Sequence, residues 1–422
     1  MIRIGIVGCG RILVAHLRGY QLLREAGIDD FRITALCARR EQDARMYLRR
    51  GEGPPQRPPV GSSPGDPLAV GDVYLSDFQD DVEVGVYTDY REMIANAAID
   101  AVNDFTTHAL HHQVADTAVE QGKHLLTQKP LAVSMAAGRR MCEAAEARGL
   151  TLAVFENARQ RADTRQLGWL FRSGRIGDLK MMLLANIGNW WAPDRIVAET
   201  PWRHKLIEGG GITLDIGVHL FNHFRYVGGE VVEVTGHTAV LEPRRTTRDA
   251  AGNVMDTTEC DADDTMFASF KTDRRVIGDV AASWSGHGTP LLAGSGRGVV
   301  YYGSAGSVMG DEVVADDGSR HNLAELYRDG CDAALQEQHS PQGLSSDLGV
   351  SRDFALNQLD WLTAIREQRP AETSGREGLR DLACAFAVLE SSLAKRTVAV
   401  DEVLHGELRA FQQPIDERFG LL

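Results

Sequence analysis

The sequence predicts two domains of different class: an α/β domain with a parallel sheet, then an α+β domain whose open sheet is largely antiparallel. Short β-rich runs alternate with amphipathic stretches over the first 155 residues, as in βαβ units. Beyond residue 159, strand-like runs follow one another without helices between them, which favours antiparallel pairing. With 422 residues and 43% hydrophobic content, the chain is long enough for both cores. We expect the domains at residues 1–155 and 156–422.

The first domain is expected to be a parallel sheet with helices on both faces. Its strands are expected at residues 2–7, 31–37, 101–105, 124–127 and 151–155. Its helices are expected at residues 12–25, 41–50, 90–97, 110–121 and 134–148.

Residues 51–71 break this alternation. Six of the 14 prolines fall between Pro54 and Pro67, mixed with glycine and serine. Because proline fixes φ and removes a hydrogen-bond donor, the segment is excluded as a central strand or helix. We interpret it as a loop insertion, and a tolerated surface insertion, a lid and a subunit contact remain its alternative roles.

The second domain is expected to begin with a helix at residues 164–173. Its strands are expected at residues 179–187, 231–240, 265–270, 275–283 and 298–302. The polar connection at residues 242–264 is interpreted as a loop, and two late helices are expected at residues 352–367 and 376–396.

Composition excludes several function classes. A net charge of -14 disfavours nucleic acid and anionic membranes as partners, because both attract basic surfaces. The six cysteines form no C-x-x-C pair, which argues against a zinc knuckle and for a reducing compartment. The first residues read as a strand rather than a secretory leader, and no apolar run is long enough to span a bilayer. We therefore expect a cytoplasmic protein.

A glycine-rich turn follows the first strand. Gly8 permits a tight turn after Val7, and Gly10 lets the backbone approach a pyrophosphate at the start of the next helix. The third small position of the fingerprint is Leu13, so the motif is incomplete. Its place inside a βαβ unit favours a Rossmann fold that binds a nicotinamide dinucleotide.

The end of the second strand bears on which dinucleotide binds. NAD-specific sites have an acid here that binds the ribose hydroxyls, whereas this chain has Ala38 followed by Arg39 and Arg40. Losing the carboxylate and gaining guanidinium groups suits a 2′-phosphate, which favours NADP(H) over NAD(H). Alternatively, both arginines are solvated residues at a helix start.

Two stretches carry groups suited to oxidising an alcohol. Lys129 follows a strand at the sheet edge where ligands bind, and its charge favours a developing alkoxide. Asp215 and His219 lie four residues apart after three glycines, so a helix there places both on one face. Histidine is suited to taking a hydroxyl proton. Taken singly, each motif also fits an ordinary turn or a packed histidine.

Together these motifs resemble the Gfo/Idh/MocA family of sugar and cyclitol dehydrogenases, over nearly the whole chain. Further matching stretches are residues 105–111 (FTTHALH), 156–159 (ENAR) and 173–179 (SGRIGDL). The resemblance implies that Lys129, Asp215 and His219 form the catalytic group. The family's glutamate before the lysine is Gln128 here, which puts cofactor geometry or redox balance in doubt. The resemblance also implies oligomers, a dimer or tetramer, formed through the open sheet.

The expected sites follow from these motifs and the resemblance. The expected cofactor-binding residues are Gly8, Gly10, Arg11, Ile12, Arg39, Arg40, Thr106, His111, Gln128 and Lys129. The expected substrate residues are Asn157, Arg159 and Trp202. Trp190 and Trp191 are further aromatic candidates, with core or interface packing as the alternative. The histidines at 108, 111 and 112 lack an acid or cysteine that completes a metal site, so we assign no metal.

The predicted function is reversible hydride transfer between NADP or NAD and a secondary hydroxyl of a sugar, cyclitol or glycoside. Two alternatives remain. One is a lyase or hydrolase that oxidises a sugar hydroxyl only transiently. The other is a nucleotide-sensing regulator without chemistry, which has no need to keep Lys129, Asp215 and His219.

Overall fold

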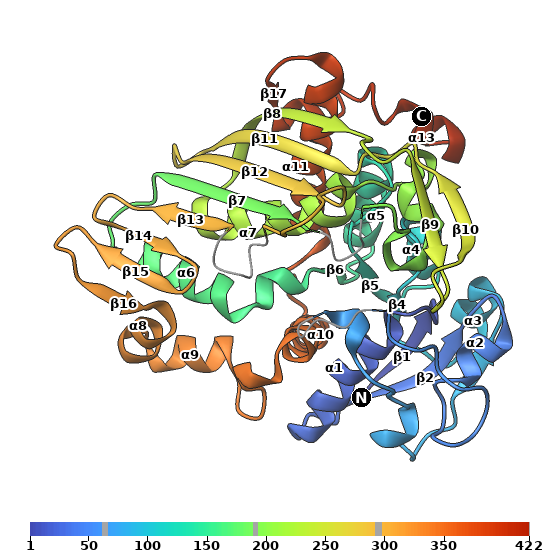
Figure 1. Ribbon diagram of the computed structural model, residues 1–422. Coiled ribbons are helices and arrows are strands. Elements are labelled where there is room, and N and C mark those ends of the chain that lie inside the picture. The colour runs from blue at the N-terminus through green and yellow to red at the C-terminus, as the bar shows by residue number, and fades with distance from the viewer. Residues whose placement is uncertain (61–65, 189–192, 292–297, 422) are drawn as a thin grey trace. The chain divides into compact units, whose positions relative to one another are not determined.

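The protein is described by a computed structural model that covers residues 1–60, 66–188, 193–291 and 298–421 (Figure 1). The described residues form two compact units. Unit 1 comprises Met1–Val133, Ala137–Gln160 and Ser340–Gly378, and unit 2 comprises Ser134–Ala136, Arg161–His339 and Leu379–Leu422. The expected boundary at residues 155–156 falls inside unit 1, which the chain re-enters after residue 339.

A parallel sheet forms the centre of unit 1, which confirms the predicted α/β class. Among the described residues, six strands pair in the order β3-β2-β1-β4-β5-β6, all in parallel. They are β1 (Ile2–Val7), β2 (Phe31–Cys37), β3 (Gly85–Tyr87), β4 (Ala101–Asp104), β5 (His124–Gln128) and β6 (Leu152–Phe155). The strand order reverses between β1 and β4, and ligands of Rossmann folds bind at this reversal.

Helices cover this sheet, and most match the predicted ranges. They are α1 (Leu13–Glu25), α2 (Glu41–Arg45), α3 (Tyr90–Asn96), α4 (His111–Glu120), α5 (Met135–Ala147) and α10 (Val350–Glu367). Helix α10 comes from the distant end of the chain and packs on α1. Its Gln358 donates a hydrogen bond to the carbonyl of His16 on α1 (3.0 Å), and its buried Phe354 and Trp361 join the core around β1.

The predicted helix at residues 41–50 is wrong beyond Arg45. The carbonyl groups of Tyr47 and Leu48 accept hydrogen bonds from the backbone amides of Leu75 (2.9 Å) and Ser76 (3.0 Å). The amides of Tyr47 and Leu48 donate to carbonyls three residues earlier, those of Ala44 (3.1 Å) and Arg45 (3.3 Å), so the α-helical hydrogen-bond pattern ends here. The described parts of the insertion, residues 51–60 and 66–71, contain no strand and one short 3₁₀ turn, Pro67–Ala69.

Unit 2 contains a mixed, largely antiparallel sheet, as predicted. Its order in the described part of the chain is β16-β15-β14-β13-β7-β12-β11-β8-β17, with only the β7–β12 pair parallel. The strands are β7 (Met181–Ile187), β8 (Val231–Ala239), β11 (Thr265–Thr272), β12 (Ile277–Ser283), β13 (Val299–Tyr302), β14 (Gly306–Met309), β15 (Glu312–Ala315), β16 (Arg320–Asn322) and β17 (Val398–Ala399).

Helices α6 and α7 run along one face of this sheet (Figure 1). The helices of this part of the chain are α6 (Ala162–Arg172), α7 (Val218–Gly228), α8 (Leu323–Gly330), α9 (Ala333–His339), α11 (Gly375–Ala394), α12 (Val400–Leu404) and α13 (Gln413–Phe419). In the described ranges, we find no helix with both the length and the apolar character that a membrane span requires.

The interpretation of residues 242–264 as a loop is wrong. They contain a two-stranded hairpin of β9 (Arg244–Arg248) and β10 (Val254–Glu259). Most of its side chains are exposed or half-buried, so the sequence lacks the apolar alternation that marks a strand. The exceptions are Thr258 and Arg245, and the Arg245 guanidinium is fully buried and pairs with Asp264 (3.2 Å).

Candidate active site

The glycine-rich turn after β1 is built for a tight chain reversal and for a ligand. Gly8 has a φ of +99°, and a Cβ there would lie 2.5 Å from the carbonyl oxygen of Phe105. A side chain is therefore excluded by both conformation and space. At Gly10, by contrast, an added Cβ would meet no atom within 4 Å. This open space beside the residues that lead into α1, Arg11 and Ile12, fits the close approach of a pyrophosphate.

The loops after β4 and β5 are linked by hydrogen bonds at the same edge of the sheet. The buried Asp104 accepts hydrogen bonds from the backbone amide (3.1 Å) and hydroxyl (2.6 Å) of Thr106. The ring Nδ1 of His111 donates to the carbonyl of Pro130 (2.9 Å), directly after Lys129. The Nε2 of this buried histidine has no hydrogen-bond partner among the described residues, so it is available as an acceptor.

Gln128, which replaces the family's glutamate, is matched to a buried histidine. Its Oε1 accepts from the backbone amide of Lys129 (3.0 Å), and its Nε2 lies 2.8 Å from Nε2 of His16. Complete burial lowers the pKa of His16 well below its ordinary value, so the ring is neutral. The amide therefore donates to a lone pair on His16, a contact that a carboxylate cannot make. His16 is therefore a hydrogen-bond partner that suits a glutamine at position 128.

The residues after β2 carry exposed positive charge. Ala38 is buried and its amide donates to the carbonyl of Tyr87 (3.1 Å). Arg39 is exposed and has no polar partner in the described part of the chain. Arg40 forms a bidentate contact with Asp43 in α2 (2.9 and 3.0 Å).

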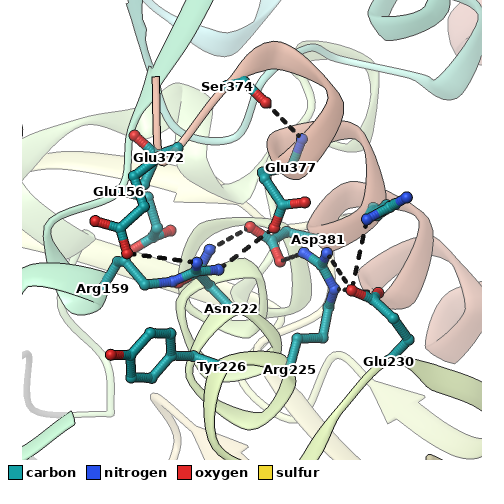
Figure 2. Close-up of polar contacts among 12 residues, drawn as sticks. Glu156, Arg159, Asn222, Arg225, Tyr226, Glu230, Glu372, Ser374, Glu377 and Asp381 are labelled. Carbon is teal, nitrogen blue, oxygen red and sulfur yellow. Dashed lines mark hydrogen bonds and ion pairs between the residues drawn. The ribbon is translucent and has the colours of Figure 1, made fainter. Parts of the chain in front are cut away.

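The two substrate candidates after β6 differ in environment. Asn157 is half-buried and begins a 3₁₀ turn, whereas Arg159 is buried. The Arg159 guanidinium lies near two carboxylates of unit 1, Glu372 (3.8 Å) and Glu377 (3.5 Å), as Figure 2 shows. These ion pairs give Arg159 a structural role independent of any substrate.

Unit 2 carries the glycine–aspartate–histidine stretch, and its first turn is π-helical rather than α-helical. The π turn spans Thr213–Gly217 and continues into α7, which carries His219 in its first turn. The backbone amide and hydroxyl of Thr213 donate to the Asp263 carboxylate (3.1 and 2.6 Å). Gly211, with a φ of +107°, lies so close that a Cβ would be 2.1 Å from Asp263 Oδ1. Asp263 thus fixes the turn that carries Asp215.

The pH dependence of stability is expected to report on this anchor. Burial raises the pKa of Asp263 from 3.8 to about 6. Because the folded-state pKa lies above the unfolded one, the free energy of unfolding falls as pH rises from 4 to 6, by about 3 kcal/mol. In Asp263→Asn this contribution is absent. Urea denaturation of both proteins at pH 4 to 7 measures how the free energy of unfolding of each changes with pH. If both change in parallel, the raised pKa of Asp263 is contradicted.

Asp215 is buried and held by an arginine. Its Oδ2 accepts from Nε of Arg203 (3.1 Å), and the same guanidinium donates to the hydroxyl of Thr200 (2.6 Å). The guanidinium also lies over the ring of Trp202, 4.4 Å from its centroid. Asp215, Arg203 and Trp202 therefore form one cluster in unit 2, in which the carboxylate is oriented by the guanidinium.

The structure groups the predicted residues into two sets. The turn and loops after β1, β2, β4 and β5 bring the cofactor candidates and Lys129 to the carboxyl edge of the unit 1 sheet. Unit 2 contains Asp215, His219 and Trp202, whereas Trp190 and Trp191 lie outside the described residues. Sequence reasoning missed His16 and Arg203. The only signal for Arg203 was its place beside Trp202, and a lone histidine in a helix gives none.

The part of the chain that the structure describes contains no group of three or more histidine, cysteine, aspartate or glutamate residues able to hold a metal ion. His111 makes the contact with Pro130 given above, and burial lowers the pKa of His112 to about 4.

Comparisons with known proteins agree with this arrangement. Residues 71–156 match the model described as an oxidoreductase family with an NAD-binding Rossmann fold, and residues 164–309 match the GFO/IDH/MocA C-terminal domain. Levoglucosan dehydrogenase of Pseudarthrobacter phenanthrenivorans is 22% identical, over 75% of this chain and 84% of its own. Myo-inositol 2-dehydrogenase of Thermotoga maritima is 23% identical, over 95% and 99%. A structure of levoglucosan dehydrogenase with NADH and levoglucosan has a TM-score of 0.69 at 19% identity, covering 94% and 98%.

Proposed function

Because the chain belongs to the Gfo/Idh/MocA oxidoreductase family, we propose that it transfers hydride between a nicotinamide dinucleotide and a secondary hydroxyl of a sugar, cyclitol or glycoside. The observation that carries the proposal is the open glycine turn before α1 in a chain that also keeps Lys129, Asp215 and His219. Dehydrogenases of levoglucosan and myo-inositol among the relatives support a polyhydroxylated substrate.

The proposed roles of the residues follow from their chemistry. When bound, a nicotinamide dinucleotide would supply the acceptor for hydride from the carbinol carbon, or the hydride donor in the reverse direction. His219 takes the hydroxyl proton during oxidation, and Lys129 donates a hydrogen bond that stabilises the alkoxide. Asp215, which Arg203 positions by a hydrogen bond, accepts from a substrate hydroxyl and fixes its orientation. In the reverse direction, His219 returns the proton.

The remaining site residues are assigned to binding. Gly8, Gly10, Arg11 and Ile12 would hold the pyrophosphate, and Thr106, His111 and Gln128 would line the path to the nicotinamide. Asn157 and Trp202 are proposed to bind substrate, whereas Arg159 is the weakest substrate candidate because Glu372 and Glu377 already pair with it. Residues 1–155 would supply most of the cofactor site, and residues 156–422 most of the substrate site.

We propose NADP(H) as the preferred cofactor, on the exposed Arg39 and the missing acid after β2. Arg39→Ala is expected to lower kcat/KM for NADP by about 10- to 100-fold, because a charged hydrogen bond to the 2′-phosphate is lost. With NAD the value should stay within about twofold, since NAD has no such phosphate. Exposed Arg91 offers a control substitution, Arg91→Ala. An unchanged cofactor preference would remove Arg39 from the site.

A substrate panel tests the proposed function. Sugars, cyclitols and glycosides are offered with NADP and with NAD while the absorbance of reduced nicotinamide is followed. Growth of this absorbance with one class of compound supports the dehydrogenase. Glycoside cleavage with retained nicotinamide and no net absorbance change would replace it by the transient-oxidation lyase or hydrolase. Cofactor binding without any conversion would favour the nucleotide-sensing regulator.

We also propose that two copies of the chain pair through the unit 2 sheet. The face of β7, β11 and β12 opposite α7 exposes apolar side chains, among them Met181, Leu183, Phe267 and Ile277. A depression of about 480 Å³ lies on this face. Apolar faces of this kind are typical of interfaces, and a second copy offers the same face in a two-fold arrangement. Sedimentation of a monomer at micromolar concentration would contradict this proposal.

The cytoplasmic location remains a proposal, supported by six free cysteines, which suit a reducing compartment. Cell fractionation tests it, and recovery of the mature protein outside the cytoplasm would contradict it. The expected absence of nucleic-acid and membrane partners remains a prediction from the net charge of -14.

A further inference from the structure

The proline-rich insertion is anchored at its start beside the glycine-rich turn. Gln56 is buried, and its amide donates to the carbonyls of Met46 (3.2 Å) and Val73 (2.7 Å). These two bonds tie the segment to the chain on both of its sides. The position of the next residue, Arg57, is therefore set by a buried anchor rather than by a solvated loop.

Arg57 joins the turn after β1 to the start of α2. Its Nη1 donates to the carbonyl of Cys9 (3.1 Å), between the two glycines of the turn, and its Nη2 donates to Asp43 (2.7 Å). In return, Nη1 of Arg11 donates to the carbonyl of Pro58 (3.0 Å). The insertion thus forms a second wall along the glycine-rich turn, made by the described residues 54–60.

The charges at this wall favour an anion. Asp43 is shared by two guanidinium groups, those of Arg57 and Arg40, while Arg39 adds a third. Glu41 beside Arg40 is neutralised by Arg45 (2.5 Å), so three positive charges against the Asp43 carboxylate leave the cluster net positive. Nη1 of Arg57 also donates to the sulfur of Met46 (3.7 Å). Arg57 retains donors beyond these three contacts, because a guanidinium carries five N–H groups, and about a quarter of its side chain is exposed (26%). In a Rossmann fold the adenosine ribose binds between the β1 turn and the end of β2.

We propose that Arg57 is a cofactor-specificity residue, which binds the 2′-phosphate of NADP(H) from the insertion side while Arg39 and Arg40 bind it from the β2 side. The proposal rests on the NADP preference proposed above and deepens it. Asp43 then orients two guanidinium groups before the phosphate arrives, which reduces the ordering needed on binding. It also gives the insertion a role that neither a tolerated surface loop nor a subunit contact provides.

Nucleotide fragments test this proposal without turnover. Adenosine 2′,5′-bisphosphate carries the 2′-phosphate, whereas 5′-AMP lacks it, and calorimetry measures the affinity of the full chain for each. Arg57→Gln is expected to weaken the bisphosphate about 10- to 100-fold and to leave 5′-AMP within about twofold. Arg49→Gln removes the same charge near the start of the insertion, where Arg49 is exposed and lies 3.7 Å from Glu52, and should change neither affinity.

The outcomes separate the proposal from its premise. If Arg57→Gln lowers the affinity for both nucleotides equally, Arg57 only stabilises the glycine-rich turn. If it lowers neither affinity, Arg57 does not contact the nucleotide. Either result overturns the proposal and leaves the NADP preference standing. A wild-type protein that binds both nucleotides equally would overturn the NADP preference as well. Arg57→Lys keeps the charge without the fork, so it should fold even if Arg57→Gln does not. An intermediate, bisphosphate-selective loss in this variant supports the proposal, and wild-type selectivity with unchanged affinity would overturn the guanidinium contact.

Discussion

Replacing His219 by alanine is expected to lower kcat by about 10²- to 10⁴-fold, because the substrate hydroxyl then loses its general base. Lys129→Met should cause a loss of similar size, since the alkoxide loses a charged hydrogen-bond donor. Affinity for the dinucleotide should stay within about threefold in His219→Ala, because the histidine acts on the substrate. Steady-state kinetics with the best substrate of the panel and quenching of protein fluorescence by the cofactor measure the two quantities.

Two exposed residues offer matched controls for these substitutions. His287 is exposed on a loop of unit 2, and Lys271 is exposed near the end of β11. His287→Ala and Lys271→Met should both keep wild-type kcat. Melting curves should be unchanged in all four variants. Retained turnover in both His219→Ala and Lys129→Met would end the catalytic assignment.

The largest expected effect on stability comes from a buried ion pair in unit 2. Arg225 on α7 is almost fully buried and donates to Asp381 on α11 (2.5 Å), which also accepts from Asn222 (2.6 Å), as Figure 2 shows. Arg225→Met fills much of the same space but leaves the Asp381 carboxylate buried without its cation. We expect a loss of about 3–5 kcal/mol in the free energy of unfolding, measured by urea denaturation.

A double variant separates charge from packing at this pair. Arg225→Met with Asp381→Leu leaves no buried charge at the pair, so it should recover part of the loss. Arg380, which precedes Asp381 on α11, is half-exposed and lies 3.6 Å from Glu230. Arg380→Met should therefore cost less than about 1 kcal/mol. A loss below 1 kcal/mol in Arg225→Met would show that water or Asn222 compensates the charge.

The parts of the fold that the sequence predicted well are those where burial leaves a local apolar pattern. Strands β1 and β2 are buried on both faces, and their predicted and observed bounds are identical. Elements whose stability depends on distant contacts were not predictable in this way. After α2 ends at Arg45, the chain is held by the distant residues Leu75 and Ser76, whose amides donate to the carbonyls of Tyr47 and Leu48. The hairpin of β9 and β10 is mostly exposed, so its residues carry no apolar alternation.

The candidate site shows the same division. Motif residues such as Gly8 and Gly10 were predictable because the local backbone requires them. The side chains that form hydrogen bonds with these motifs come from distant parts of the sequence. His16 reaches Gln128 across 112 positions, and Arg57 reaches Cys9 across 48. Such pairs are fixed by tertiary packing, and a single sequence carries no local signal for them.

The return of the chain to unit 1 has a consequence for biosynthesis. Helix α10, which covers α1, belongs to the segment that begins at Ser340, whereas the preceding part of unit 1 ends at Gln160. At about 5–20 residues per second, the ribosome needs roughly 10–40 s to make the intervening stretch. During that interval the apolar side of α1 lacks its cover and is a target for chaperones. In a recombinant fragment that ends at residue 160, the apolar side of α1 stays uncovered. A soluble cofactor-binding fragment therefore requires α10 to be supplied, for example by circular permutation.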